Sequence, residues 1–246
     1  MFQENLLFRN YIVVLAEIIK PKFHKSRLLL LYLLQNNSMR YKLLRYFELI
    51  ALFIAVPMSY TVGWLRGPKF LPLFLGLVYT ITVMYKKGGL PKDIFKLKFN
   101  GFLPSMVLRF LLVGTLLTLY VYIFEPGNFL VLPRTRLWLW LAIMVFYPIF
   151  SALPQEIIYR TYFTFRYADL FREERLAWII NALLFGWVHI IFHNEVALIG
   201  GLLMGMLWYQ TYRRTGSIWA VTLEHAMYGN LIYTIGFGHY FYVPDF

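Results

Sequence analysis

A few ionisable side chains stand inside long apolar stretches in the second half of the sequence. Glu156 and Arg160 lie in QEIIYR, His189 closes FGWVH, and Glu224 and His225 open EHAMYGN. A charge at membrane depth costs on the order of 3 kcal/mol, so such groups pair, line a wet cavity or carry out chemistry. A carboxylate and an imidazole are groups that proteins use to take a proton from water. The pattern therefore indicates acid and base chemistry supplied by three separate segments.

Helical spacing predicts which of these groups meet. Glu156 and Arg160 are four residues apart, on one helix face and in the order that favours an ion pair. Pro154 predicts that a new helix begins just before Glu156, where the helix dipole would favour an ionised carboxylate. Each group also has a structural interpretation. Glu156 and Arg160 could be a buried ion pair that locks two helices, and His189 and His225 could be hydrogen-bonded core histidines.

The segments that carry these residues belong to a membrane protein. Of 246 residues, 60% are hydrophobic and 20% aromatic, and the mean hydropathy of +0.59 exceeds that of soluble domains. We predict an all-α, polytopic helical membrane protein with about seven transmembrane helices, because seven apolar runs approach the roughly 20 residues that cross a hydrocarbon core. These runs lie near residues 47–65, 70–85, 102–124, 137–154, 176–193, 195–212 and 218–236.

Basic residues dominate the N-terminal part of the chain. Seven Lys and Arg lie between residues 20 and 45, and two short apolar stretches, YIVVLAEII and LLLLYLL, lie between the basic clusters. We expect these stretches to form amphipathic helices at the membrane interface. The net charge of +12 is therefore attributed to contact with anionic headgroups of the lipid bilayer, and no nucleic-acid partner is expected. We divide the chain into a basic amphipathic segment, 1–46, and a transmembrane domain, 47–246.

The cations also predict the orientation in the membrane. Counted from residue 20, a cytoplasmic N-terminus places seventeen Lys and Arg on the inside and four in the outside loops. Cytoplasmic loops carry such an excess. We expect an integral, multi-pass protein with its N-terminus in the cytoplasm and its C-terminus on the opposite side. The chain has no cysteine, which excludes disulfides, thiolate zinc sites and a cysteine nucleophile.

The three polar segments resemble, in their order, the motifs of the CPBP (CAAX protease and bacteriocin-processing, or Abi) family of intramembrane endopeptidases, which is related to the type II CAAX prenyl endopeptidases. The family pattern runs EExxxR, FxxxH and HxxxN, and the family-like core covers about residues 137–236. The resemblance implies an enzyme without a cofactor. It implies hydrolysis of a peptide or lipidated-protein substrate at the membrane, CAAX-type prenylated proteins among them.

The resemblance also implies roles for matching residues. Glu156 falls on the second Glu of the first motif and Arg160 on its Arg, while Phe185 and His189 match the second motif and His225 the third. In the family, a carboxylate and a histidine activate water, and a His and an Asn donate to the oxyanion. We therefore expect Glu156 and His189 to activate water. We expect His225 to donate to the oxyanion and Arg160 to orient Glu156.

Two positions depart from the family pattern. Gln155 replaces the first Glu, the general base that the resemblance implies, and Gly229 stands where the motif has Asn. Asn230 follows one residue late, about 100° around the helix. We expect Gln155 to position water or substrate. Asn230 and Glu224 are secondary candidates for contact with the substrate or the oxyanion.

Three alternatives stay open. In a zinc site, His189 and His193 would be ligands at i and i+4 of one helix, with Glu156 as the third ligand, although the chain has no HExxH. A non-catalytic relative, used in bacteriocin immunity or scaffolding, is favoured by Gln155. A small proton-coupled transporter would use the buried Glu and His as relay groups, but the two halves of the chain do not repeat each other.

The expected depths of the site residues conflict. At ~1.5 Å per residue, His189 lies about 20 Å and His225 about 10 Å from the cytoplasmic ends of their runs. Glu156 lies near the inner end of the fourth run instead. A helix break at Pro148 or Pro154 would reconcile these depths, because proline favours such breaks.

Overall fold

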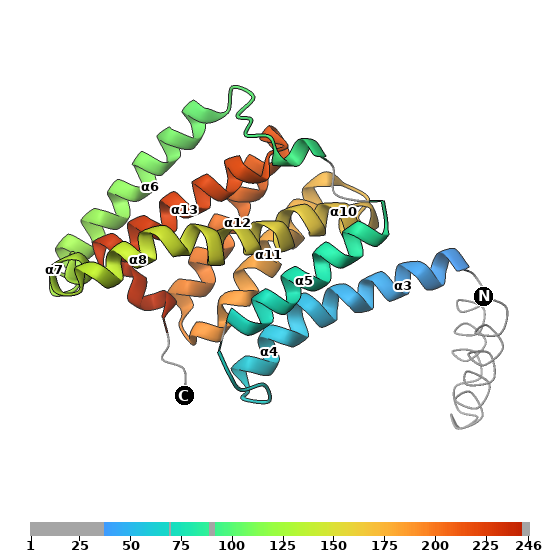
Figure 1. Ribbon diagram of the computed structural model, residues 1–246, viewed down its shortest axis with the longest axis horizontal. Helices are drawn as coiled ribbons and strands as arrows, with labels where there is room; N and C mark the ends of the chain where they lie inside the picture. Colours follow the sequence, from blue (N-terminus) through green and yellow to red (C-terminus); the bar gives the residue numbers. More distant parts are fainter. Residues whose placement is uncertain (1–36, 69, 89–91, 243–246) are drawn as a thin grey trace. The chain divides into compact units, whose positions relative to one another are not determined.

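A computed structural model describes residues 37–68, 70–88 and 92–242, and every regular element in these ranges is helical (Figure 1). The predicted interfacial helices within residues 5–36 lie outside the described residues. The chain divides into two units between Glu48 and Leu49. The predicted functional division between residues 46 and 47 stays a prediction.

The helices follow one another with short connections. The first half contains α3 (Asn37–Ile50), η2 (Ala51–Ala55), α4 (Val56–Thr61), α5 (Phe70–Lys86), η3 (Lys92–Phe95), α6 (Leu103–Phe124) and α7 (Val131–Thr135). The second half contains α8 (Leu137–Tyr147), η4 (Pro148–Ala152), α9 (Leu153–Glu156), η5 (Ile157–Tyr162), α10 (Phe163–Tyr167), η6 (Ala168–Leu170), α11 (Glu174–Val188), η7 (His189–Phe192), α12 (Glu195–Thr215), α13 (Ile218–Ile235) and η8 (Phe237–Phe241).

Four helices in the described part of the chain are long and apolar enough to cross a membrane. They are Met39–Thr61, Leu103–Phe124, Leu137–Leu170 and Glu174–Phe192, and α5 is a shorter apolar helix. The protein is therefore an all-helical, multi-pass membrane protein. α12 and α13 are helical over the last two predicted runs, but the count of about seven spans stays a prediction.

The fourth predicted run belongs to one continuous helix, Leu137–Leu170. Pro148 has φ −54° and ψ −38°, and the chain continues past it through the π-helical segment η4. Pro154 lies in the first turn of α9, which also continues the helix. A proline cannot donate to the helical ladder, and a wider π turn accommodates it here without a break. The predicted break, and the predicted fresh helix start before Glu156, are therefore wrong.

The length of this helix reconciles the expected depths of Glu156 and His189. Glu156 lies 14 residues before Leu170, and His189 lies 15 residues after Glu174, the first residue of the next helix. At ~1.5 Å per residue, both stand about 21 to 22 Å from the short connection between the two helices. The apolar run seemed to end at residue 154 only because polar site residues follow it.

Close packing of α11 against α12 forms the centre of the bundle (Figure 1). A Cβ added at Gly186 would lie 2.9 Å from the Cβ of Leu202, and one added at Gly205 would lie 3.1 Å from the backbone of Ala182. Small residues allow helix backbones to approach in this way. Around this contact lies a buried aromatic core, in which the Phe185 ring meets Trp208 edge to face at 5.5 Å.

A buried ion pair connects α6 to α13. The guanidinium of Arg109 meets both carboxylate oxygens of Glu224, with Nε 2.8 Å from Oε1 and Nη2 3.0 Å from Oε2. Nη1 of Arg109 also donates to Gln210, and the hydroxyl of Thr211 donates to Glu224. The Glu224 side chain is only 1% exposed. Because burying an unpaired charge is costly, these contacts hold α6 against α12 and α13.

We predict that Arg109→Met destabilises the protein by about 3 to 5 kcal/mol, because it leaves the Glu224 carboxylate buried without its cation. Unfolding of the detergent-solubilised protein measures the effect. Arg213→Met is the matched control, since Arg213 pairs with Glu174 where both side chains are exposed, at 43% and 65%. Such a pair contributes at most about 1 kcal/mol. Equal effects of the two substitutions would contradict the structural role of the Arg109 pair.

Candidate active site

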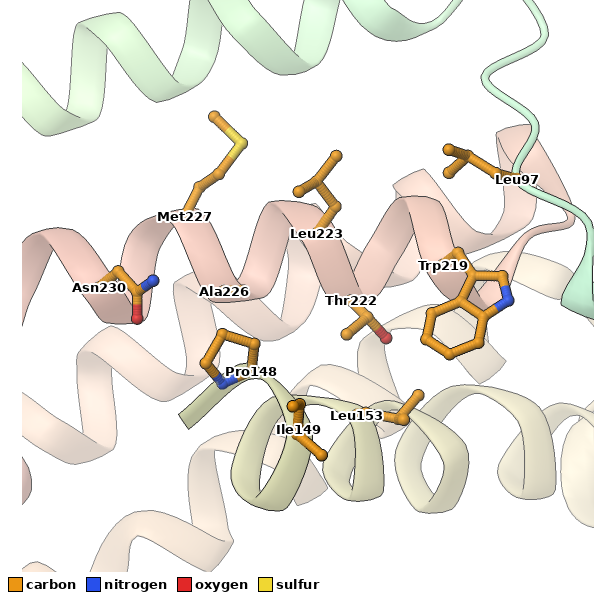
Figure 2. Close-up of a pocket in the computed structure, with 10 residues that line it drawn as sticks. All are labelled: Leu97, Pro148, Ile149, Leu153, Trp219, Thr222, Leu223, Ala226, Met227 and Asn230. Atoms are coloured by element: carbon orange, nitrogen blue, oxygen red, sulfur yellow. The ribbon is translucent and has the colours of Figure 1, made fainter. Parts of the chain in front are cut away.

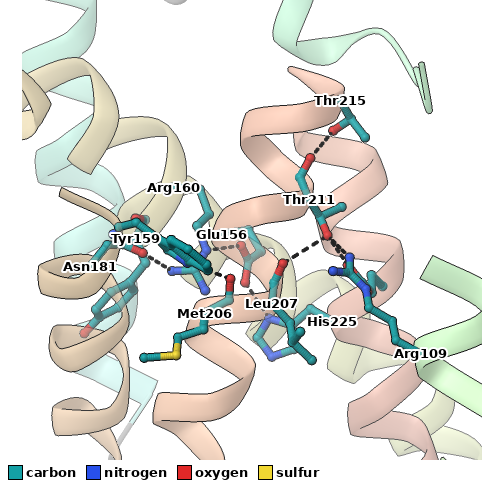
Figure 3. Close-up of polar contacts among 12 residues, drawn as sticks. Arg109, Glu156, Tyr159, Arg160, Asn181, Met206, Leu207, Thr211, Thr215 and His225 are labelled. Carbon is teal, nitrogen blue, oxygen red and sulfur yellow. Dashed lines mark hydrogen bonds and ion pairs between the residues drawn. The ribbon is translucent and has the colours of Figure 1, made fainter. Parts of the chain in front are cut away.

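Glu156 lies at the centre of a buried polar cluster between the 137–170 helix and α13 (Figure 3). Its side chain is fully buried, and Oε1 lies 2.8 Å from Nδ1 of His225. Oε2 lies 3.1 Å from Nε of Arg160, an ion pair four residues along the helix. The predicted pairing of Glu156 with Arg160 is confirmed. Arg160 therefore compensates the charge that desolvation would otherwise disfavour.

Arg160 is held by contacts from α11. Its Nη1 donates to Oδ1 of Asn181 at 2.8 Å, and its Cζ lies 4.6 Å from the centre of the Phe185 ring. The amide of Asn181 donates in turn to the backbone carbonyl of Tyr159. Tyr159 and Arg160 lie in the π-helical segment η5, and π turns occur often at functional sites. Asn181 could not be singled out from the sequence, because an Asn within an apolar helix has many structural roles.

His225 is fixed from several sides. Its ring stacks on Trp208 with centroids 3.7 Å apart, and its Nε2 lies 2.9 Å from the hydroxyl of Tyr147. A carboxylate only accepts hydrogen bonds, so Nδ1 carries the proton toward Glu156. In the neutral imidazole, Nε2 then accepts from the Tyr147 hydroxyl. Glu156, His225 and Tyr147 thus form a chain of hydrogen bonds.

His189 lies near the hydrogen-bonded group of Glu156, His225 and Tyr147. Its Nδ1 donates to the backbone carbonyl of Phe185 at 2.7 Å, which leaves Nε2 as the acceptor of the neutral ring. The Phe185 ring lies 5.1 Å from His189 and 5.9 Å from His225, so it contacts both imidazoles. Gly201 makes room for the ring, since a Cβ there would lie 2.6 Å from Nδ1 of His189.

The direct partner of Glu156 differs from the expected one. Among the described hydrogen bonds, Glu156 is joined to His225, while His189 bonds the Phe185 carbonyl. Glu156 and His189 were expected to meet directly or through water, and the direct contact that Glu156 makes is with His225 instead. Spacing along single helices could not show this, because the two histidines stand on different helices. A contact between Glu156 and His189 through water stays a prediction.

The proposed zinc ligands do not come together. His193 has a left-handed backbone with φ 55° and follows the end of the helix at Phe192. His189 and His193 therefore do not share a helix face, so the assumption of i and i+4 ligands on one helix is wrong. Within the described residues, no group of three or more His, Cys, Asp or Glu side chains could hold a metal ion.

The remaining candidates have mixed outcomes. Gln155 is half-buried beside the cluster, and its Nε2 donates to the Ser151 hydroxyl at 2.9 Å. Glu224 meets Arg109 through both of its oxygens, and its contact with substrate or oxyanion stays a prediction. Arg109 was not predicted as a partner of Glu224, although it is the single cation inside the 102–124 run.

Asn230 connects α13 to α8. Its Nδ2 donates to the backbone carbonyl of Met144 at 3.2 Å. In a regular helix this carbonyl would accept from the residue four positions later, but that residue is Pro148, which has no N–H. Asn230 therefore satisfies a carbonyl that the proline leaves without its usual donor, which explains its place one residue after the motif position.

A cavity of about 470 Å³ lies along α13 beside these contacts (Figure 2). Its walls are mostly apolar and come from the 137–170 helix, from α13 and from the segment before α6. The lining residues are Leu97, Pro148, Ile149, Leu153, Trp219, Thr222, Leu223, Ala226, Met227 and Asn230. Neither Oδ1 of Asn230 nor the hydroxyl of Thr222 makes a hydrogen bond with a described residue. The cavity thus offers apolar walls, and these two polar atoms are buried beneath its surface.

Fold and site together define a helical membrane protein with a buried carboxylate, arginine and histidine at its centre. Residues 136–231 match the family model described as Rce1-like, type II CAAX prenyl endopeptidase Rce1-like. The chain therefore contains an Rce1-like domain, which confirms the resemblance to the CPBP family, and this domain holds the whole Glu156 cluster. No curated protein and no solved structure matches the chain at a significant level.

Gly229, which stands at the motif Asn position, has its side-chain space filled by Tyr147. A Cβ added at Gly229 would lie 2.0 Å from Cε1 and 2.5 Å from the hydroxyl oxygen of Tyr147. Tyr147 and Gly229 therefore depend on each other. The absence of the motif Asn at position 229 was visible in the sequence. Nothing in the sequence indicated that Tyr147 fills the space.

We predict that Gly229→Ala destabilises the protein by about 1 to 3 kcal/mol, because overpacking forces Tyr147 out of place. Gly200→Ala is the matched control. Gly200 is also a mid-helix glycine, but a Cβ there would make an ordinary contact of 3.6 Å. Both variants share the gain in helix propensity, so a difference between their unfolding midpoints isolates the clash. Equal midpoints would show that Tyr147 moves aside freely.

Proposed function

We propose that this protein is an intramembrane endopeptidase that hydrolyses peptide bonds of membrane-associated substrates with activated water and without a cofactor. The observation that carries the proposal is the fully buried Glu156–His225 hydrogen bond, with Arg160 as counter-charge. Such groups are costly at membrane depth, and a structural ion pair alone has no need of the added histidine. The match of residues 136–231 to the Rce1-like family supports the same reaction.

Glu156 and His225 form the unit that activates water in this proposal. With Nδ1–H directed to Glu156, the neutral His225 presents Nε2 as a proton acceptor. When Nε2 takes a proton from water, the Glu156 carboxylate stabilises the imidazolium, as a carboxylate does in other base and orienter pairs. This assignment changes the predicted role of His225, because a neutral ring in this tautomer has no proton on Nε2 to give to an oxyanion.

The other residues support this unit. Arg160 pairs with Glu156 and orients it, and Nε2 of His189 is a second acceptor that orients the attacking water. Gln155, whose amide nitrogen is engaged by Ser151, has its side-chain oxygen left to position water or substrate. These roles require no further titratable group from outside the cluster.

We propose a lipidated peptide or protein as substrate, with CAAX-type prenylated proteins as the first class to test. The mostly apolar cavity along α13 supports this choice, because an aliphatic chain gains free energy by burial against such walls. His225 stands on the same stretch of α13. An aliphatic lipid chain bound in the cavity would therefore bring the peptide attached to it near the Glu156 cluster.

A non-catalytic membrane protein is the second candidate. Gln155 in place of a glutamate favours it, because an amide cannot accept a proton as a base. In this case, the cluster would shape a peptide-binding cavity, and wild type would cleave nothing. Gln155→Glu would then be expected to restore some hydrolysis.

We propose that the N-terminus is cytoplasmic, next to anionic headgroups, and that the C-terminus lies on the opposite side. The positive-inside excess predicts that residues 86–98, 166–175 and 213–214 face the cytoplasm. Single cysteines introduced into this cysteine-free chain, one in each segment, can be labelled with a membrane-impermeant reagent. Labelling of 86–98 and 166–175 from opposite sides would contradict this topology.

We predict that Glu156→Gln and His225→Ala each lower the cleavage rate by about 10² to 10⁴, since each removes part of the unit that takes the proton. Gln155→Ala should lower the rate less. The assay follows, by mass spectrometry, a panel of membrane-tethered peptides incubated with purified protein in liposomes. Glu174→Gln is the matched control, because this carboxylate is exposed, pairs with Arg213 and has no role in the proposed site.

Chelation provides an independent arm of the same assay. Activity should survive a chelator, because the site uses carboxylate and imidazole without a metal ion. Full activity of Glu156→Gln would overturn the proposed function. Cleavage by Gln155→Glu, with none by wild type, would establish the non-catalytic alternative instead.

A further inference from the structure

We propose that Tyr147 is a catalytic residue, which donates its hydroxyl hydrogen to the carbonyl oxygen of the peptide under attack. The proposal rests on the proposed endopeptidase function and adds the donor for the oxyanion. Three observations on the geometry of Tyr147, Gly229 and Asn230 carry it.

The first observation is the direction of the Tyr147 hydroxyl. Its oxygen lies 2.9 Å from Nε2 of His225, the atom assigned to take the proton from water. The Tyr147 ring packs edge to face on His225 and on Tyr233, with centroids 5.9 and 5.7 Å away. These two contacts fix the ring and leave the hydroxyl at its end free to rotate. A donor is therefore held beside the base, and rotation of the hydroxyl releases Nε2 of His225.

The second observation concerns Gly229. The hydroxyl oxygen of Tyr147 lies 2.5 Å from the position of a Cβ at residue 229. Residue 229 is one helical turn after His225, so a polar side chain at this position would lie on the same face as the imidazole. In this chain Tyr147 brings a polar group to that place from a different helix. Tyr147 thus fills the space of a side chain at residue 229 and places a hydrogen-bonding group there.

The third observation concerns the nearest competitor. The Nδ2 of Asn230 carries two N–H groups, and one of them already donates to the carbonyl of Met144, the carbonyl that Pro148 cannot bond. This bond holds the Asn230 amide against α8. The Tyr147 hydroxyl, in contrast, lies 2.9 Å from Nε2 of His225 and only has to rotate to reach another acceptor.

The reaction is balanced with these groups. The Tyr147 hydroxyl turns from His225 to the peptide carbonyl oxygen, which frees Nε2 of His225. Water adds its oxygen to the carbonyl carbon and gives its proton to Nε2, while the negative oxygen accepts a hydrogen bond from Tyr147, which stays protonated. The imidazolium then gives the proton to the leaving nitrogen as the C–N bond breaks. Preorganised donors of this kind stabilise the charge that develops in the transition state.

The test compares Tyr147→Phe with Tyr233→Phe in liposomes. Tyr147→Phe keeps the ring and removes only the hydroxyl, so kcat should fall by about 10²- to 10³-fold with little change in KM. Tyr233→Phe is the matched control, because it removes a hydroxyl from the ring that packs on Tyr147. Its kcat should stay near that of wild type.

A rescue variant separates catalysis from packing. Tyr147→Ala with Gly229→Asn removes the clash and returns a donor one turn after His225, so the double variant should be more active than Tyr147→Ala alone. Wild-type activity in Tyr147→Phe would overturn this inference and leave the proposed function intact. A loss of activity that matches a fall in the unfolding midpoint, without rescue, would also overturn it. Wild type that cleaves no substrate would overturn both proposals.

Discussion

The negative charge of Glu156 in the interior of the bundle governs the arrangement of the site. The Glu156 carboxylate is fully buried, and an uncompensated charge at such depth costs several kcal/mol. Arg160 supplies the counter-charge from the next turn of the same helix, and His225 supplies a hydrogen bond from α13. Asn181 on α11 then holds Arg160. Three helices are thus positioned by the need to satisfy one carboxylate.

The π-helical segments explain how one helix presents several groups to the same imidazole. Tyr147 and Glu156 are nine residues apart, about two and a half turns of a regular α-helix, which would place them on opposite faces. The segment η4 lies between them and contains more residues per turn. Tyr147 and Glu156 can therefore contact the two ring nitrogens of His225 from one continuous helix. Pro148, at the start of η4, is where the regular ladder becomes impossible.

Spacing along one helix could be predicted from the sequence, and contacts between helices could not. The Glu156–Arg160 ion pair follows from a separation of four residues, and the apolar runs indicated where most of the helices lie. Hydropathy misplaced the end of the fourth run at residue 154, because the buried site residues that follow resemble a polar boundary. The rotation of α13 against the 137–170 helix decides that His225, rather than His189, meets Glu156. A hydrophobic period carries no information on that rotation.

The presence of Gln155, where the family pattern has a glutamate, is consistent with the balance of buried charges in the structure. Each of the two fully buried carboxylates in the described residues meets one arginine, Glu156 with Arg160 and Glu224 with Arg109. A glutamate at position 155 would add a half-buried negative charge next to Glu156, and like charges in a low dielectric disfavour each other. Gln155 avoids this repulsion and still reaches Ser151. In the proposed mechanism, the imidazole that Glu156 orients takes the proton in place of a second carboxylate. The loss of a second glutamate and the close contact between Glu156 and His225 are therefore parts of one electrostatic solution.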